Sequence, residues 1–341
     1  MNAWYQQTGP YGETALASFA TLSRNIGGLP FPVRLNLPQK NAVASAVYAG
    51  ISERLAHGAL THMNSLYPYE AVSLAERSII PPDFAAAPDG AALITDEAQP
   101  VCILLCGEDH VRIRAWHSGL DPAGAYKTAD AIDDILNAQL HFAFHPKLGY
   151  LNQDPLNVGT GLRAAVLLHL PALCKSGAIA ALASTAGKLG FSLKGAYGNG
   201  IAVPGDVFAL ENTVTMGLSE EQAISNLKSL CLQMANKERD AAEAMLEDPA
   251  ALDRIHRAAA LLTSATLLTA AETLDLLSSV RMGALYGVVN ADVQKLNALF
   301  ATVQPATVNC AAGQKLSAPE RDALRAKTVK RTLAEASAEV R

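Results

Sequence analysis

The stretch NQDPLNVGTGLRAAVLLHL, residues 152–170, holds a glycine loop followed by a strand, and the rest of the chain is interpreted from it. Glycines spaced in this way are typical of loops that bind phosphate through backbone N–H groups. The same loop carries a carboxylate at its mouth, Asp154, which would repel a phosphate. The first question is therefore what an acidic side chain does at this position.

The residues that follow the loop, LRAAVLLHL, alternate in the manner of a buried strand. Arg163 is then a cation at the base of the loop. No second side chain stands at metal-ligand spacing from His169, which favours a core or rim histidine over a metal ligand. We therefore expect no metal site made of protein side chains. The alternation places four side chains on one side of the strand: Arg163, Ala165, Leu167 and His169.

A second strand-like segment is VCILLCGEDHVRIRAW, residues 101–116, which is rich in β-branched and aliphatic residues. One interpretation of its polar residues is the solvated face of an antiparallel sheet. The other is the polar floor of an active site, which is favoured because CILLC is too apolar for an edge strand in water. If the segment is one strand, four titratable side chains share a face: Glu108, His110, Arg112 and Arg114.

Helical patterns divide the chain into two regions. Residues 39–58 carry apolar side chains at four-residue intervals and end on a glycine, which predicts a helix that stops there. A capping box from Ser219 to Gln222 opens a longer helix, and the chain beyond it is almost purely helical. We expect a mixed α+β domain over residues 1–242 and a helical domain over residues 243–341.

Composition excludes several classes of protein. The chain has 341 residues, half of them hydrophobic, and a formal charge of −5, which gives no general attraction to nucleic acid or acidic lipid. No apolar run reaches the roughly 18 residues needed to cross a membrane. The cysteines are five in number, without a CxxC pair, and suit reduced core thiols. We expect a cytoplasmic protein that binds neither nucleic acid nor membrane.

The last predicted helix carries two arginines four residues apart. A capping box from Ser317 to Glu320 opens it, and the sequence then reads RDALRA. Arg321 and Arg325 share a helix face and could bind one phosphate together through their planar donors. The alternative is a solvated basic turn whose charge Glu320 and Asp322 balance.

Several motifs, taken together, resemble one superfamily. They are SRNIGGLPFP (23–32), EDHVRI (108–113), HPKLGYL (145–151), NVGTGLRA (157–164), ALYGVV (284–289) and ERDALRA (320–326). In this order they resemble the ATP:guanido phosphotransferases, and specifically the bacterial protein arginine kinases, from about residue 9 almost to the end. The resemblance implies an α+β fold, in which a catalytic domain with a large antiparallel sheet flanked by helices precedes an all-α C-terminal domain.

The resemblance also implies a reaction and its residues. These kinases move the γ-phosphoryl group of ATP to an arginine side chain of a protein, with Mg²⁺ held largely by the nucleotide. Glu108 matches the catalytic carboxylate, and Arg112 and Arg163 match arginines that bind phosphate. Ser18, His110 and Lys194 fall on the nucleotide side of the family's site.

For the C-terminal helices, the resemblance implies a dimerisation and docking domain with a pocket that senses phosphoarginine. Four residues match that pocket: Arg321, Asp322, Arg325 and Ala326. By the same resemblance, the protein would act as a homodimer on protein substrates, with an activator subunit and a protease as possible partners.

The chain departs from the family pattern mainly where the nucleotide binds. Phe19 and Thr21 stand where the family has two phosphate-binding arginines, and an aromatic ring cannot replace a guanidinium. Since each such arginine is worth orders of magnitude in rate, weak or absent kinase activity is predicted. The other departures are Ser78 for an adenine-side histidine, Lys194 for an arginine, Asp154 for a reactive cysteine and Asn199 for a carboxylate that helps to hold the substrate.

Two functions stay open from the sequence. One is a protein arginine kinase that uses ATP with Mg²⁺ through a rearranged clamp, recruiting Arg24, Arg34 or Arg114. The other is a dimeric regulatory protein without catalysis or cofactor, which reads phosphoarginine through Arg321 and Arg325. A kinase of small guanidino metabolites is disfavoured, because those enzymes carry a further helical domain before this region.

Overall fold

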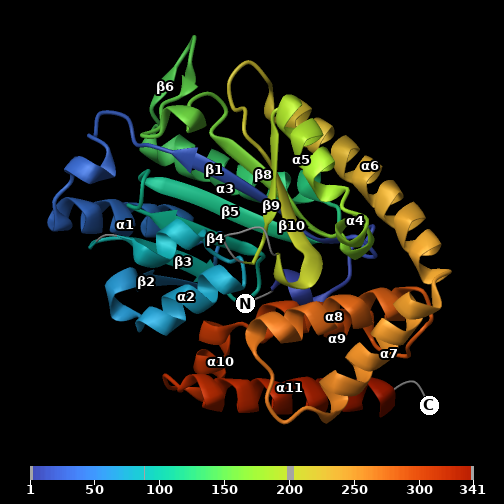
Figure 1. Ribbon diagram of the computed structural model, residues 1–341. Helices are drawn as coiled ribbons and strands as arrows, with labels where there is room; N and C mark the ends of the chain where they lie inside the picture. Colours follow the sequence, from blue (N-terminus) through green and yellow to red (C-terminus); the bar gives the residue numbers. More distant parts are fainter. Residues whose placement is uncertain (1–2, 88, 198–202, 339–341) are drawn as a thin grey trace.

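The computed structural model describes residues 3–87, 89–197 and 203–338, with side chains as far as residue 334. Its centre is an eight-stranded sheet in the order β2-β3-β4-β5-β1-β8-β10-β9, in which neighbouring strands run antiparallel (Figure 1). A two-stranded ribbon, β6 with β7, stands beside it. The strands are β1 (Ala15–Arg24), β2 (Gly58–His62), β3 (Ala92–Asp96), β4 (Val101–Leu105), β5 (Val111–Ser118), β6 (Phe144–His145), β7 (Gly149–Tyr150), β8 (Leu162–His169), β9 (Phe191–Gly195) and β10 (Val207–Asn212).

Helices cover the sheet and form the C-terminal part of the chain. In Figure 1, α6 runs along the right side of the sheet toward α7–α11, which gather below it. The helices are α1 (Leu37–Ile51), α2 (Pro68–Glu76), α3 (Pro122–Leu140), α4 (Pro171–Lys175), α5 (Ile179–Lys188), α6 (Glu220–Leu246), α7 (Pro249–Ser264), α8 (Ala270–Leu285), α9 (Val293–Thr302), α10 (Pro305–Ala312) and α11 (Ala318–Ala338).

The central strand β1 separates two hydrophobic cores. All ten of its residues are buried, and successive side chains point to opposite faces. Ala20 and Leu22 pack in a core shared with α1, α3 and α6. Phe19 packs in the other core, which includes side chains of α2 and of the C-terminal helices, among them Phe300 and Val329. The C-terminal helices therefore pack on the sheet face from which position 19 projects.

The expected fold class is confirmed, and so is the long helix that the Ser219 capping box begins. Two local predictions are wrong. The helix predicted to stop at Gly58 ends at Ile51, and Gly58 instead begins β2. Residues 101–116 are not one strand but two, β4 and β5, joined by a turn. The Gly-Glu-Asp sequence of that turn interrupts the apolar run. The prediction of a single strand did not take this interruption into account.

The boundary predicted between residues 242 and 243 falls inside α6, which continues without interruption to Leu246. Pro249 then begins α7. No described helix is long and apolar enough to span a membrane.

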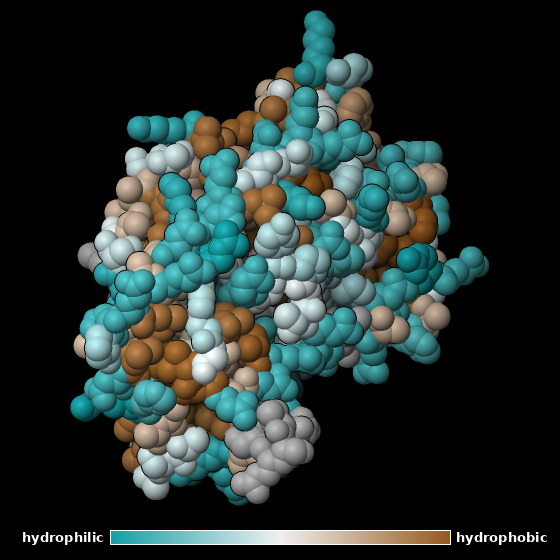
Figure 2. Space-filling view, turned by 90° about the vertical axis from the view of Figure 1, so that its right-hand side faces the viewer, coloured by the Kyte–Doolittle hydropathy of each residue, from teal (hydrophilic) through white to brown (hydrophobic). Residues whose placement is uncertain are grey.

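The C-terminal helices leave apolar side chains exposed. Figure 2 shows apolar residues gathered low on the molecule, at the height of these helices, whereas polar residues dominate above. Exposed apolar side chains of this part of the chain include Leu261, Leu267 and Tyr286.

Candidate active site

The turn between β4 and β5 carries the acidic side chains of the site. Asn25, the residue after β1, holds this turn: its Nδ2 donates to Asp109 Oδ1 at 2.7 Å, and its Oδ1 accepts the His110 N–H at 3.0 Å. His110 is fully buried, and its Nδ1 accepts the backbone N–H of Ile26 at 3.2 Å. The ring of His110 therefore supports the turn from inside, and a contact of His110 with nucleotide stays a prediction.

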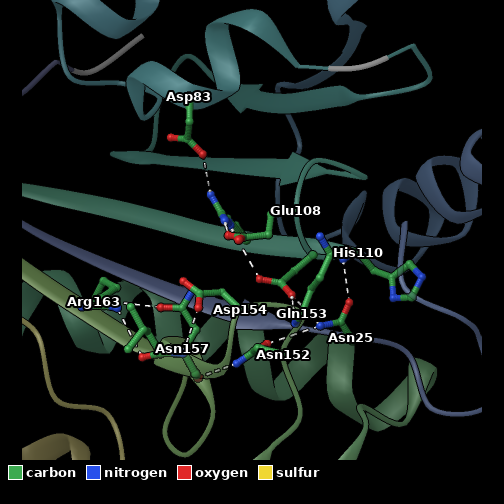
Figure 3. Close-up of polar contacts among 12 residues, drawn as sticks. Asn25, Asp83, Glu108, His110, Asn152, Gln153, Asp154, Asn157 and Arg163 are labelled. Atoms are coloured by element: carbon green, nitrogen blue, oxygen red, sulfur yellow. Dashed lines mark hydrogen bonds and ion pairs between the residues drawn. The ribbon is translucent and has the colours of Figure 1, made fainter. Parts of the chain in front are cut away.

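Arg112 lies among three carboxylates at the start of β5. Its guanidinium contacts Glu108 directly, lies 3.1 Å from Asp83 Oδ2, and approaches Asp109 Oδ2 at 3.7 Å (Figure 3). Glu108 and Arg112 meet as expected, but because Glu108 stands in the turn and not because the two alternate along one strand. Burial raises the pKa of Asp109, and hydrogen bonds from the Gln153 N–H and Asn25 oppose this shift.

The glycine loop docks onto the same turn. The Gln153 N–H donates to Asp109 Oδ1 at 3.0 Å, and Asn25 Nδ2 reaches the Leu151 carbonyl at 3.1 Å. Within the loop, Asn152 Nδ2 donates to the Asn157 carbonyl at 2.6 Å. Figure 3 shows these polar side chains converging between the end of β1 and the loop. The turn and the loop, distant in sequence, are one connected structure.

Close backbone packing explains the loop glycines. Gly159 and Gly161 have φ values of 117° and 65°, in the region that favours glycine. A Cβ at Gly159 would lie 2.2 Å from the Thr215 carbonyl oxygen, and one at Gly161 would lie 2.6 Å from that of Ser23. The glycines thus let the loop pack against β1 and against the segment after β10.

Arg163 and Asp154 both stabilise the loop. Arg163 donates from Nε to Asn157 Oδ1 at 2.8 Å, and its other nitrogens reach the carbonyls of Asn212 and Leu156. Asp154 Oδ1 accepts the Leu156 N–H at 2.9 Å and so begins the short 3₁₀ turn Pro155–Asn157. The acidic side chain at the mouth of the loop therefore has a local structural role.

Positions 19 and 21 of β1 are buried beneath an arginine of β5. The Arg114 guanidinium lies 4.5 Å from the centre of the Phe19 ring, and its Nη1 donates to Thr21 Oγ1 at 3.1 Å. Its Nε donates to the carbonyl of Ser78 at 3.2 Å. Ser18 points to the opposite face, where its Oγ donates to the Gly119 carbonyl at 2.7 Å. Ser18 is fully buried there, and its contact with nucleotide stays a prediction.

The remaining predicted residues lie apart from this cluster. Lys194 is exposed on the edge strand β9, next to β10 in the sheet. Asn199 lies outside the described residues. Arg325 is 1% exposed, and its guanidinium donates to the carbonyls of Val303 and Leu268 and to Asp322. Arg321 is partly exposed and donates to the Leu316 carbonyl at 2.7 Å.

Sequence reasoning missed the polar side chains that assemble the site. The motifs SRN and EDH contained Asn25 and Asp109, but their contact joins residues 84 positions apart. Asp83 lies in the 3₁₀ turn Pro82–Ala86, which none of the motifs includes. The other residues missed are Asn152 and Asn157; Asn157 begins the motif NVGTGLRA, whereas no motif includes Asn152.

Comparison with known proteins shows which class of protein shares this sequence and fold. Residues 40–241 match the family model described as ATP:guanido phosphotransferase, C-terminal catalytic domain. Two solved structures share the fold. The crystal structure of lombricine kinase matches with a TM-score of 0.59 and 19% identity, over 70% of this chain and 69% of that one. A taurocyamine kinase of Schistosoma mansoni matches with a TM-score of 0.58 and 20% identity, over 67% of this chain and 33% of that one.

The rest of the chain narrows the class to one family. Residues 249–341 match the model described as Protein-arginine kinase McsB C-terminal domain. A protein-arginine kinase of Moorella thermoacetica is 36% identical over 97% of both chains. A second, from Symbiobacterium thermophilum, is 34% identical over 97% of this chain and 96% of its own. The chain belongs to the protein-arginine kinase family.

Proposed function

We propose that the protein is a weakened protein-arginine kinase, which transfers the γ-phosphoryl group of ATP to arginine side chains of proteins at a much reduced rate. One observation carries this proposal: Glu108 and Arg112 meet beside the glycine loop, at the same end of the sheet. Transfer to a guanidinium needs a carboxylate and a phosphate-binding cation close together, and both are present here.

The residues present would hold the phosphates of ATP with fewer cations than the family pattern provides. Arg112 and Arg114 of β5 project from the sheet face that holds Thr21. Arg163 of β8 projects from the same face. Bound ATP would supply the phosphoryl group, with Mg²⁺ held largely by the nucleotide. The weakness lies in Phe19 and Thr21, because neither provides a cation. Lys194 keeps a charge but loses the two-pronged geometry of an arginine.

The contact between Glu108 and Arg112 supports a role for Glu108 toward substrate. A carboxylate that already binds one guanidinium can bind and orient another once a phosphate engages Arg112. Glu108 would then accept the proton that the substrate nitrogen loses. Asp154 adds negative charge nearby, since its carboxylate interacts electrostatically with Asp109. It attracts a guanidinium but cannot replace a thiolate.

A second candidate is a dimeric regulatory protein that binds phosphoarginine without catalysis. Arg321, Asp322 and Arg325 lie together at the start of α11, which favours this reading. Binding a phosphate through Arg325 would require its guanidinium to exchange the carbonyls of Val303 and Leu268 for the ligand. A homodimer, an activator subunit, a protease partner and a cytoplasmic location belong to the proposal in either form.

Thermal-shift titrations with Mg-ATP and with phosphoarginine separate the two candidates. We expect Mg-ATP to raise the melting temperature in proportion to its binding, and Arg321→Ala to leave this effect unchanged. Stabilisation by phosphoarginine alone, abolished by Arg321→Ala, would overturn the kinase proposal in favour of the second candidate. Failure of both ligands to stabilise the protein would contradict both.

A further inference from the structure

Thr21 lies between two arginines in a row that crosses three strands. In the register of the sheet, Thr21 pairs with Arg114 of β5 on one side and with Arg163 of β8 on the other. Directly opposed residues of antiparallel strands project to the same face, and neighbouring strands are about 4.8 Å apart. Position 114 is therefore one strand spacing from position 21, on the same surface.

The side chain of Arg114 covers the two positions at which the resembling kinases carry arginines. Its Nη1 donates to Thr21 Oγ1 at 3.1 Å, and its guanidinium carbon lies 4.5 Å from the centre of the Phe19 ring. A threonine and a phenylalanine thus leave room for, and hold, a guanidinium that comes from the neighbouring strand.

We propose that Arg114 is a phosphate-binding residue of this site, a cation moved by one strand from position 21 to its cross-strand partner. The inference rests on the proposed function, because it assigns Arg114 to the ATP that a kinase would use. The row keeps two arginines, at positions 114 and 163, on either side of an uncharged residue.

The surroundings of Arg114 suit a ligand-binding cation. The hydrogen bonds described for it go to neutral oxygens, those of Thr21 and Ser78, whereas Arg112 contacts carboxylates. Glu211 of β10 and Asp83 are the carboxylates that act on it electrostatically. Burial lowers the pKa of Arg114 to about 10, so the guanidinium keeps its charge at neutral pH.

The other arginines named from the sequence are not placed for this role. Arg24 is 2% exposed, forms an ion pair with Asp133 at 2.9 Å and lies 3.5 Å from the centre of the Tyr150 ring. Arg34 is exposed in the 3₁₀ turn Pro32–Arg34, outside the sheet.

The row of position 19, next to that of Thr21, shows which of the missing arginines Arg114 replaces. Phe19 pairs with Trp116 of β5 and with Ala165 of β8, so this row contains no cation. In the described strands β1, β5 and β8, the missing arginine at position 21 has a replacement in Arg114, whereas the row of position 19 holds none. The site is thus weakened by one cation rather than by two.

Equilibrium binding measured by calorimetry tests the assignment. In Arg114→Gln, the affinity for Mg-ATP should fall by about tenfold or more, the usual effect of losing a hydrogen bond between charged groups, while adenosine binds as it does to the wild type. The double variant Thr21→Arg with Arg114→Thr returns the cation to β1 and should bind Mg-ATP within a few-fold of the wild type.

Two further variants serve as controls. Arg257→Gln removes an exposed arginine of α7 that pairs with Asp253, and should leave Mg-ATP affinity unchanged. Arg114→Lys keeps the charge without the planar fork, should give an intermediate loss, and decides the question if Arg114→Gln does not fold.

The outcomes separate this inference from the function on which it rests. Wild-type protein that binds no Mg-ATP would overturn both. Wild-type protein that binds Mg-ATP, with Arg114→Gln and Arg114→Lys binding it equally well, would overturn the inference alone. Equal losses of ATP and adenosine affinity in Arg114→Gln would also overturn it, because they would show that Arg114 only supports the pocket.

Discussion

The sheet and the terminal helix both present arginines, but packing gives these arginines different roles. At the end of the sheet, Arg114 lies partly exposed over β1, and the hydrogen bonds described for it end on neutral oxygens. In α11, Arg325 is 1% exposed and joins two separate segments by binding their carbonyls at Leu268 and Val303. Spacing along the chain identifies which arginines are neighbours, but only the tertiary structure shows how their donors are used.

The largest expected effect on stability comes from Arg325. Arg325→Ala leaves two backbone carbonyls and Asp322 without their buried donor, and should lower the free energy of unfolding by about 3 kcal/mol. Arg321→Ala, its matched control on the same helix face, should lower it by less than about 1 kcal/mol. Urea unfolding followed by circular dichroism measures both.

Equal and small losses of stability in Arg325→Ala and Arg321→Ala would contradict the structural role given to Arg325. They would mean that the Arg325 guanidinium contributes little to folding and is available to a ligand, as the phosphoarginine-binding candidate requires.

The elements could be predicted where the signal is local. The capping box at Ser219 correctly placed the start of α6, because side chain and backbone meet within one helical turn. The strand predicted over residues 101–116 was wrong, since the apolar periodicity of β4 and β5 hid the turn between them. Periodicity indicated a mixed α+β region followed by a helical one, and the motif resemblance added the large antiparallel sheet flanked by helices.

The site could be predicted only in part, because its contacts join distant segments. Glu108 and Arg112 were identified from the sequence, and they do meet. The link from Asn25 to Asp109 and the pairing of Thr21 with Arg114 depend on strand register. Register is decided by packing over the whole sheet. The sequence therefore did not distinguish Arg114 from Arg24 or Arg34 as the arginine that binds phosphate.

Glu238 of α6 gives a smaller effect on the free energy of unfolding, and this effect depends on pH. Glu238 of α6 is buried and accepts the N–H groups of Ala172 and Leu173. Burial raises its pKa from 4.5 to about 7. A raised carboxyl pKa means that the folded state binds the proton more tightly, so its stabilising contribution is present below about pH 4.5 and is lost as the pH rises through about 7.

The variant Glu238→Gln tests this effect. Between pH 4.5 and 7, wild-type stability should fall relative to that of the variant by an amount on the order of 2 kcal/mol, and the difference should be constant above about pH 8. Melting temperatures of both proteins across this range measure it. A difference that does not change with pH would show that Glu238 is not held protonated in the folded protein.

The central claim is that the end of the sheet still carries out phosphoryl transfer, although slowly. The most direct measurement is a single-turnover reaction of wild-type protein and Glu108→Gln with saturating Mg-ATP and an arginine-rich protein, followed by mass spectrometry for acid-labile phosphoarginine. We expect slow formation of phosphoarginine by the wild type and a rate at least about a hundredfold lower for Glu108→Gln. Absence of phosphoarginine with the wild type, or equal rates for the two proteins, would contradict the claim.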